Sequence, residues 1–317
     1  MLQILSATVP IFLIVAIGYV LTRRGMFKRA DMTVLSKYVV KVALPLLVFV
    51  NVSGRRVDEI LNPTYLLTYA GAAMVMFALA FGYARIFGRS AHRATFMAMG
   101  MAGTNNGFIG FPVFLILFAE IAGAAIGMDM LVDNFLIIPL TLFLAEQAAG
   151  TGSLRVRIVS TARGVLLHPM VVAIVAAMVL NTAGITVPDV LDRTLTLLAQ
   201  TSSGVALFTV GGMLVGLRPK GMVSDIAVTV VGKLLVMPAV AIGLVVGLVT
   251  LGLPDLSPQF RAAAVLTCAL PTYSILPALA DPYGETDVAT ASMMLSTVLS
   301  FLTLTGWMLV LSAVGWM

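Results

Sequence analysis

Apolar residues gather along this chain in long stretches that short polar connections separate. Two stretches, 34–53 and 129–149, carry a few charges. Eight more carry none, and they are 1–22, 60–84, 94–119, 164–188, 194–217, 234–254, 262–280 and 288–317. Because a helix needs about 20 residues to cross the hydrocarbon core of a bilayer, the pattern predicts an all-α integral membrane protein with about ten transmembrane helices.

Two of these stretches are interrupted by polar and helix-breaking residues. The fourth span reads M-A-G-T-N-N-G-F-I-G-F-P from Met101 to Pro112, and the ninth reads L-P-T-Y-S-I-L-P from Leu270 to Pro277. Glycine permits backbone conformations that strain other residues, and proline removes a helical N–H group. Unpaired backbone at membrane depth is tolerated only where protein or a water-filled cavity surrounds it. The pair of interruptions therefore predicts the binding site of a transporter.

The composition narrows the class of protein. Hydrophobic residues make up 60% of the 317 residues and charged residues only 10%, which fits no soluble globular class. The single cysteine, Cys268, excludes an intramolecular disulfide. His92 and His168 have no third ligand at metal spacing, and the motifs of nucleotide hydrolysis and covalent catalysis are missing. We therefore predict no enzyme activity, no metal and no cofactor, and gradients as the source of energy.

Basic residues sort by the side of the membrane on which their loops fall. By the positive-inside rule, the side of the membrane with more basic residues is the cytoplasmic side. Both termini fall on the opposite side, so they are predicted to be non-cytoplasmic. This distribution accounts for the net charge of +5, so no nucleic-acid partner is predicted. The predicted environment is the lipid bilayer. The predicted cytoplasmic set is Arg23, Arg24, Lys28, Arg29, Arg85, Arg89, Arg93, Arg155, Arg157, Arg163, Arg218 and Lys220. The opposite set is Arg55, Arg56, Arg193 and Arg261.

The longest polar connection divides the chain nearly in half. We predict an N-terminal five-helix repeat at 1–150, a cytoplasmic connecting loop at 151–163 and a C-terminal five-helix repeat at 164–317. An odd number of spans in each half inverts the second repeat in the membrane. Short matches at equivalent places support the repeat, namely Val-Ala-Leu at 42–44 and 205–207 and Arg-Ala at 93–94 and 261–262.

The polar residues of the two interruptions are the candidate substrate ligands. Amides, hydroxyls and freed backbone N–H groups can hold an anion without a lysine or arginine. The candidates are Thr104, Asn105, Asn106, Gly107 and Pro112 in the fourth span, and Pro271, Thr272, Tyr273, Ser274 and Pro277 in the ninth. The alternative, in which these residues serve helix packing or repair a proline kink, stays open.

Charged residues inside the predicted spans are functional candidates, because an ionised group is costly in the bilayer. Lys41, shortly before Pro45, and Asp133 are candidates for ion coupling or for contact with an anion, and Lys233 is a third intramembrane charge. For Lys41 the alternative is that its long side chain reaches the basic membrane surface.

These residues together resemble the auxin efflux carrier family over essentially the full length of the chain. The resemblance is strongest to its bacterial members, which are described as organic-acid or malonate permeases. The motifs that carry it are VALPLL at 42–47, the segment 105–112, ALPT at 269–272 and LSTVLS at 295–300.

The resemblance implies two inverted five-helix repeats with crossing discontinuous helices 4 and 9, a plan similar to that of bile-acid symporters and Na⁺/H⁺ antiporters. It implies a transport part that moves like an elevator beside a scaffold part. The helices would cross at Pro112 and at Pro271 or Pro277, and the family's substrate-contacting asparagine maps onto Asn105 or Asn106.

The function implied by the resemblance is secondary active or facilitative transport of a small organic anion, a malonate-like mono- or dicarboxylate, across the bacterial inner membrane. The chain lacks the long hydrophilic loop of plant members and has Tyr273 and Ser274 where many relatives carry an asparagine, which argues against auxin. A sodium-coupled organic-anion symporter of the bile-acid type and a non-transporting membrane receptor for a small acid are the alternatives. Coupling to H⁺ or Na⁺ and assembly into a homodimer stay open.

Overall fold

All regular structure in the computed structural model is helical across the residues that the structure describes, 2–53, 62–149, 167, 169–185, 187–216 and 223–317. Seven helices in this part are long and apolar enough to cross a membrane: Ala30–Val50, Pro63–Ile86, Ala91–Leu117, Ala122–Ala149, Asp189–Met213, Val223–Thr250 and Thr286–Ala313. The described residues also include two shorter apolar helices, Phe12–Arg23 and Val171–Thr182. The predicted class, an all-α membrane protein, agrees with these helices.

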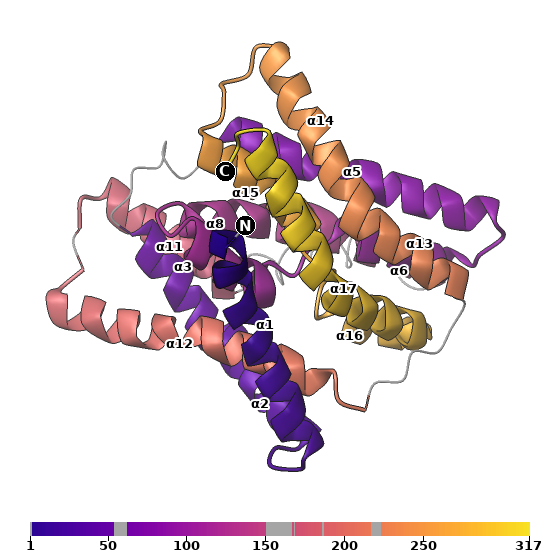
Figure 1. The fold of residues 1–317 in the computed structure, drawn as a ribbon, viewed down its shortest axis with the longest axis horizontal. Helices are drawn as coiled ribbons and strands as arrows, with labels where there is room; N and C mark the ends of the chain where they lie inside the picture. Colours follow the sequence, from indigo (N-terminus) through magenta and orange to yellow (C-terminus); the bar gives the residue numbers. More distant parts are fainter. Residues whose placement is uncertain (1, 54–61, 150–166, 168, 186, 217–222) are drawn as a thin grey trace. The chain divides into compact units, whose positions relative to one another are not determined.

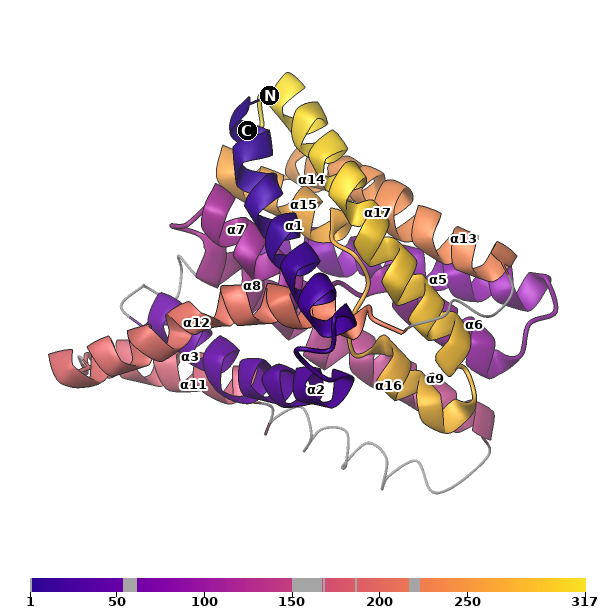
Figure 2. The ribbon, with the colours of Figure 1, turned by 60° about the horizontal axis from the view of Figure 1, so that its bottom comes forward.

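The chain forms two compact units, and its helices are drawn in Figure 1 and, from a second direction, in Figure 2. Unit 1 comprises Met1–Asn62, Asn106–Met130 and Val165–Gly216. Unit 2 comprises Pro63–Asn105, Leu131–Gly164 and Leu217–Met317. Each unit takes segments from both halves of the chain, so the compact units differ from the halves that we predict as repeats. The inverted repeat itself stays a prediction.

Several residues used for the predicted membrane orientation lie outside the described part of the chain, and so does the predicted connecting loop 151–163. These residues are Arg55, Arg56, Arg155, Arg157, Arg163, Arg218 and Lys220, and His168 also lies outside it.

Unit 1 is built from helices of the first and third quarters of the chain together with a segment from the middle of the second quarter. Its elements are α1 (Leu2–Arg23), α2 (Arg29–Tyr38), η1 (Val39–Ala43), α3 (Leu44–Val52), η2 (Asn106–Gly110), α7 (Phe111–Leu117), most of α8 (Ala122–Val132), α11 (Pro169–Thr182) and α12 (Asp189–Met213).

Unit 2 contains the two helices that precede the interruptions. Its elements are α5 (Pro63–Ile86), α6 (Ala91–Ala102), η3 (Asp133–Ile137), α9 (Ile138–Ala149), α13 (Val223–Val231), η4 (Gly232–Val236), α14 (Met237–Thr250), α15 (Pro258–Ala269), α16 (Leu276–Ala280), η5 (Asp281–Tyr283) and α17 (Thr286–Ala313).

Prolines explain four widened helical turns in the described residues. The turns η1, η2, η3 and η4 are π-helical, and in each case the next helix has proline at its second position. Proline cannot donate to the carbonyl four residues earlier and clashes with it, and here that carbonyl lies inside the π turn. The same π turn therefore precedes each of Pro45, Pro112, Pro139 and Pro238.

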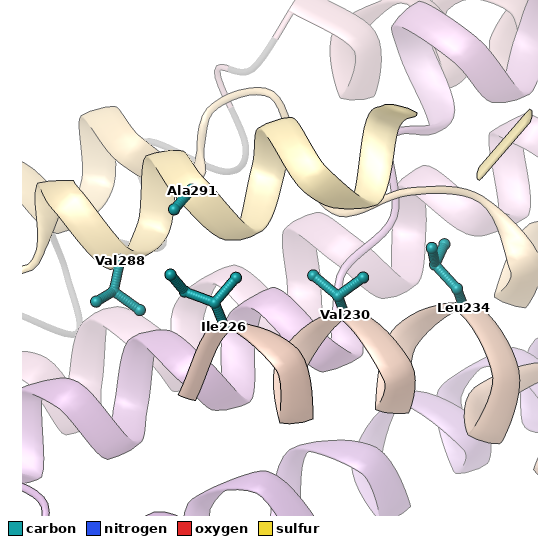
Figure 3. Packing of buried hydrophobic residues seen from close by; sticks show 5 residues of the cluster. All are labelled: Ile226, Val230, Leu234, Val288 and Ala291. Atoms are coloured by element: carbon teal, nitrogen blue, oxygen red, sulfur yellow. The ribbon is translucent and has the colours of Figure 1, made fainter. Parts of the chain in front are cut away.

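Apolar side chains hold α17 against α13 and η4 in unit 2. Ile226, Val230 and Leu234 recur every four residues and therefore share one face of the helix. Val288 and Ala291 of α17 point toward this face (Figure 3). The contact holds the first turns of α17 in place, and Ser296 farther along this helix reaches the second interruption.

Close helix packing in unit 1 depends on glycine. A Cβ atom at Gly18 of α1 would overlap the backbone carbonyl of Phe208 in α12, and one at Gly211 of α12 would overlap the carbonyl of Val15 in α1. Small residues let helix backbones approach closely in membranes, where burial of apolar surface gives little drive for association. The backbones of α1 and α12 are therefore closely packed within unit 1.

Candidate functional site

The first interruption begins where α6 ends. Gly103 has an extended backbone (φ −82°, ψ 153°), and helical structure resumes at Asn106. Thr104 and Asn105 lie between α6 and η2, and the two residues are 1% and 3% exposed. The chain is thus non-helical and buried where the sequence predicts an interruption.

The second interruption has the same local form. Leu270 follows α15 with an extended backbone (φ −62°, ψ 152°), and helical structure resumes at Leu276. Thr272 and Tyr273 are buried, and Ser274 is half-buried. Pro277 takes the second position of α16, where its missing N–H removes no helical hydrogen bond.

The two helices that lead into the interruptions start alike. Both α6 and α15 are 12 residues long, and a serine side chain caps each of them. Ser90 accepts a hydrogen bond from the backbone N–H of Arg93, and Ser257 accepts one from Phe260. Serine is a preferred N-cap because its oxygen satisfies an N–H group that has no partner inside the helix.

Two hydrogen bonds of Asn105 join the interruptions to each other within unit 2. Its backbone N–H donates to the carbonyl oxygen of Pro271 at 2.8 Å, and its side-chain Nδ2 donates to Oγ of Ser274 at 2.7 Å. A helix break leaves backbone groups without their helical partners, and such groups must be paired when buried. The second break therefore provides a carbonyl acceptor for a backbone N–H group of the first break.

Glycine at position 103 makes this approach possible. A Cβ atom there would lie inside the aromatic ring of Tyr273. The ring is buried and packs directly on the Gly103 backbone. Because position 103 has no side chain, the two breaks can come into contact.

Tyr69 of α5 connects the first interruption to the buried carboxylate of Asp133. Its hydroxyl donates to Oδ1 of Asp133 at 2.6 Å and lies 2.6 Å from Oγ1 of Thr104. A phenol has one O–H, so the Thr104 hydroxyl is the donor in the second bond. All three side chains are at most 2% exposed. Asp133 therefore belongs to the same buried network as the interruption.

Tyr69 is not among the site residues predicted from the sequence, although a signal for it exists. Tyr65 and Tyr69 stand one turn apart in an otherwise apolar helix, and a buried tyrosine usually finds a partner for its hydroxyl. In the structure the Tyr65 hydroxyl lies 3.1 Å from Oγ1 of Thr267 in α15. One face of α5 thus supports both of the helices that break.

Ser296 of α17 supports the second interruption from its other side. Its hydroxyl accepts a hydrogen bond from the backbone N–H of Thr272 at 3.4 Å and donates to the carbonyl of Met293. Ser296 falls inside the segment 295–300 that carries the family resemblance. Its contribution to the site is a contact that spacing along the chain does not reveal.

Four further predicted site residues, Lys41, Asn106, Gly107 and Pro112, belong to unit 1. The chain passes from unit 2 to unit 1 between Asn105 and Asn106. Asn106 and Gly107 are buried in η2, and Pro112 is buried in α7. Lys41 lies in η1 with an exposed side chain. In unit 2, the buried Lys233 of η4 donates to the sulfur of Met237 at 3.0 Å.

Within the described ranges, no three side chains of His, Cys, Asp or Glu come together as a metal site requires. The polar groups at the interruptions are amides, hydroxyls and backbone atoms. Such a set is suited to binding by hydrogen bonds.

A helical membrane protein with two buried, mutually bonded helix breaks has the build of a membrane transporter. The chain belongs to the auxin efflux carrier family, since the family model described as "Membrane transport protein" matches residues 3–308. A protein from Rhizobium meliloti (strain 1021) named "Putative malonate transporter" is 29% identical over 316 residues, which cover 96% of this chain and 95% of that protein. "Uncharacterized transporter YfdV" of Escherichia coli (strain K12) is 27% identical over 233 residues, covering 72% of this chain and 74% of that protein.

Proposed function

We propose that this membrane transporter carries a small organic anion, a malonate-like mono- or dicarboxylate, across the bacterial inner membrane. The observation that carries the proposal is the hydrogen-bonded pair of interruptions formed by Asn105 with Pro271 and Ser274. The name of the Rhizobium meliloti relative supports the choice of malonate as the first substrate to test.

The chemistry of the interruptions favours a carboxylate. Hydroxyls of Thr272, Tyr273 and Ser274 can donate hydrogen bonds, as can backbone N–H groups that a break removes from the helical ladder, whereas the Thr104 hydroxyl already donates to Tyr69. These donors stand on non-helical backbone inside the protein, so a carboxylate would exchange its hydration for fixed donors. Asn106 and Gly107 follow Asn105 directly in the chain and remain candidates for the same ligand.

For the mechanism we propose alternating access of the elevator type. The hydrogen-bonded interruptions and Asp133 all belong to unit 2, so this unit would carry the substrate as one body while unit 1 serves as the scaffold. Ten spans in two inverted repeats, crossing at the interruptions, belong to the same proposal, as does the orientation with both termini non-cytoplasmic.

Counterflow of radiolabelled malonate in proteoliposomes tests the proposal. The double variant Asn105→Ala, Asn106→Ala should abolish exchange, while Asn181→Ala, a half-buried asparagine of α11, should leave it unchanged. Ser274→Ala removes the Asn105–Ser274 hydrogen bond and the Ser274 hydroxyl but keeps both amides, so it separates the contribution of the amides from that of Ser274. Undiminished exchange by the double variant would overturn the proposed site.

Binding can be measured independently of transport. A ligand that binds only the folded state raises its apparent stability, by about 2.7 kcal/mol at a hundredfold excess over Kd. Malonate should raise the melting temperature of the purified protein, whereas malonamide, of the same shape but without charge, should not. An equal shift with both would rule out recognition of the carboxylate groups. Binding without any flux would favour the receptor alternative.

A further inference from the structure

A small cavity lies in unit 2 where the first turns of α6 and α17 meet the start of α16. Its volume is about 10 Å³, and Arg93, Met97, Leu276, Glu285 and Ser292 are among the residues that line it. A space of roughly 10–15 Å³ is the least that holds one water molecule. The cavity is too small for an organic anion, so it is distinct from the proposed substrate site.

Ser292 brings an unsatisfied hydroxyl to this cavity. Its side chain is 2% exposed, and among the described residues its Oγ has no hydrogen-bond partner. The other buried hydroxyls of α17 behave differently, since Ser296, Thr297 and Ser300 donate to carbonyls of their own helix. A buried hydroxyl without a partner is unfavourable, which points to a ligand for Ser292 in the cavity.

The charges around the cavity select a neutral ligand. Glu285 takes the N-cap position of α17 and pairs with Arg93, and its other oxygen accepts from Ser90. Arg93 also pairs with the fully buried Asp225, which pairs in turn with Arg89. Two arginines and two carboxylates balance each other. The guanidinium of Arg93 disfavours a cation in the cavity, and the carboxylate of Glu285 disfavours an anion.

We propose that the cavity binds a single water molecule, which bridges the Ser292 hydroxyl and the Glu285 carboxylate, and that the Arg93–Glu285 ion pair seals it from solvent. Arg93 is the partly exposed member, with 23% of its side chain accessible. A water molecule fits the volume of the cavity, can bond to the Ser292 hydroxyl and carries no net charge.

The cavity also lies close to the second interruption. Leu276 and Thr272 approach the same point, since a Cβ atom at Gly100 would lie 3.2 Å from Leu276 and 3.9 Å from Oγ1 of Thr272. That hydroxyl is buried and likewise has no partner among the described residues. We therefore assign the water site to a path by which water reaches the interruption when the ion pair opens. This role as a path rests on the proposed function, whereas the water site does not.

Hydroxyl-radical labelling of the wild-type protein by brief X-ray exposure tests the site itself. Radicals form from bound water, so Met97, which lines the cavity, should be oxidised several-fold faster than Met99 of the same helix and Met76 of α5. All three are at most 2% exposed, so exposure to bulk solvent does not separate them. Equal oxidation of the three methionines would overturn the water site, whatever the protein transports.

Cysteine accessibility tests the seal. Cys268→Ala removes the only cysteine, and Ser292→Cys then places a thiol in the cavity. Its reaction with a small water-soluble methanethiosulfonate should be slow and should accelerate several-fold when Glu285→Gln removes the ion pair. Ser300→Cys, fully buried on the same helix, is the control and should stay unreactive in both backgrounds. An unchanged rate at position 292, or an equal rise at position 300, would contradict a seal formed by Arg93 and Glu285.

Discussion

The backbone N–H of Asn105 donates a hydrogen bond to the carbonyl oxygen of Pro271 across 2.8 Å. This bond ties the non-helical segment of one half of the chain to that of the other half. The Asn105 amide adds a second bond, to Ser274, and Gly103 lets the Tyr273 ring pack against the same segment. Backbone that is unpaired in each segment alone becomes paired in the folded unit, which is how a helix break is tolerated inside a membrane protein.

Gly103→Ala should destabilise the protein. The new methyl group overlaps the Tyr273 ring, and overpacking of this kind costs about 1–3 kcal/mol. Gly82→Ala in α5 is the matched control, because a Cβ atom there meets nothing within 4 Å and alanine favours the helix. Thermal unfolding in detergent should show a lower melting temperature for the first variant and an unchanged or higher one for the second. A Gly103→Ala protein as stable as wild type would mean that Tyr273 moves aside freely.

Tyr69→Phe should loosen the first interruption without changing its volume. The hydroxyl bonds both Asp133 and Thr104, and removal of one partner from a buried polar group costs about 1–3 kcal/mol. Tyr83→Phe, on the same helix but half-buried, should change the melting temperature little. Comparison of the two melting temperatures checks this, and equal values would show that the Tyr69 hydroxyl contributes no stability.

Asp133→Asn should separate exchange from accumulation. We predict that the buried carboxylate carries the coupling to H⁺ or Na⁺, because it stands one hydrogen bond from the Tyr69 hydroxyl that contacts the interruption. The variant should keep counterflow of malonate but lose accumulation under an imposed pH or sodium gradient. Asp192→Asn, an exposed acid of α12, is the control. Accumulation by Asp133→Asn at the wild-type level would exclude this residue from coupling.

Asp225→Asn should cost far more stability than Asp255→Asn. Asp225 is fully buried and pairs with Arg89 and Arg93, so its neutralisation removes the carboxylate between the two arginines and leaves Arg93 with Glu285 alone, at a cost of at most about 3–5 kcal/mol. Asp255 pairs with Arg261 but is 54% exposed, and exposed pairs contribute about 0.2–1 kcal/mol. Thermal unfolding at low and high salt checks the difference. A similar loss in both variants would show that solvent screens the cluster around Asp225 as well.

Local residue types were enough to predict an all-helical membrane protein and the positions of two helix interruptions. Long uncharged stretches can satisfy their backbone in a membrane only as helices, so 60–84 and 288–317 correspond to α5 and α17 with small shifts at the ends. Glycine and proline act on their own backbone, and for this reason the non-helical segments around Thr104 and Thr272 could be predicted from sequence. The resemblance to a transporter family rested on the same segments.

The tertiary structure alone decided which groups pair. Tyr69 sits in an uninterrupted apolar stretch, and only the folding of α5 beside α6 brings its hydroxyl to Thr104 and Asp133. Arg93 and Glu285 are far apart in sequence and form an ion pair because the first turns of α6 and α17 meet. A residue's type fixes what its own backbone can do, whereas a hydrogen bond or ion pair depends on a partner whose distance in space is not encoded by its distance along the chain.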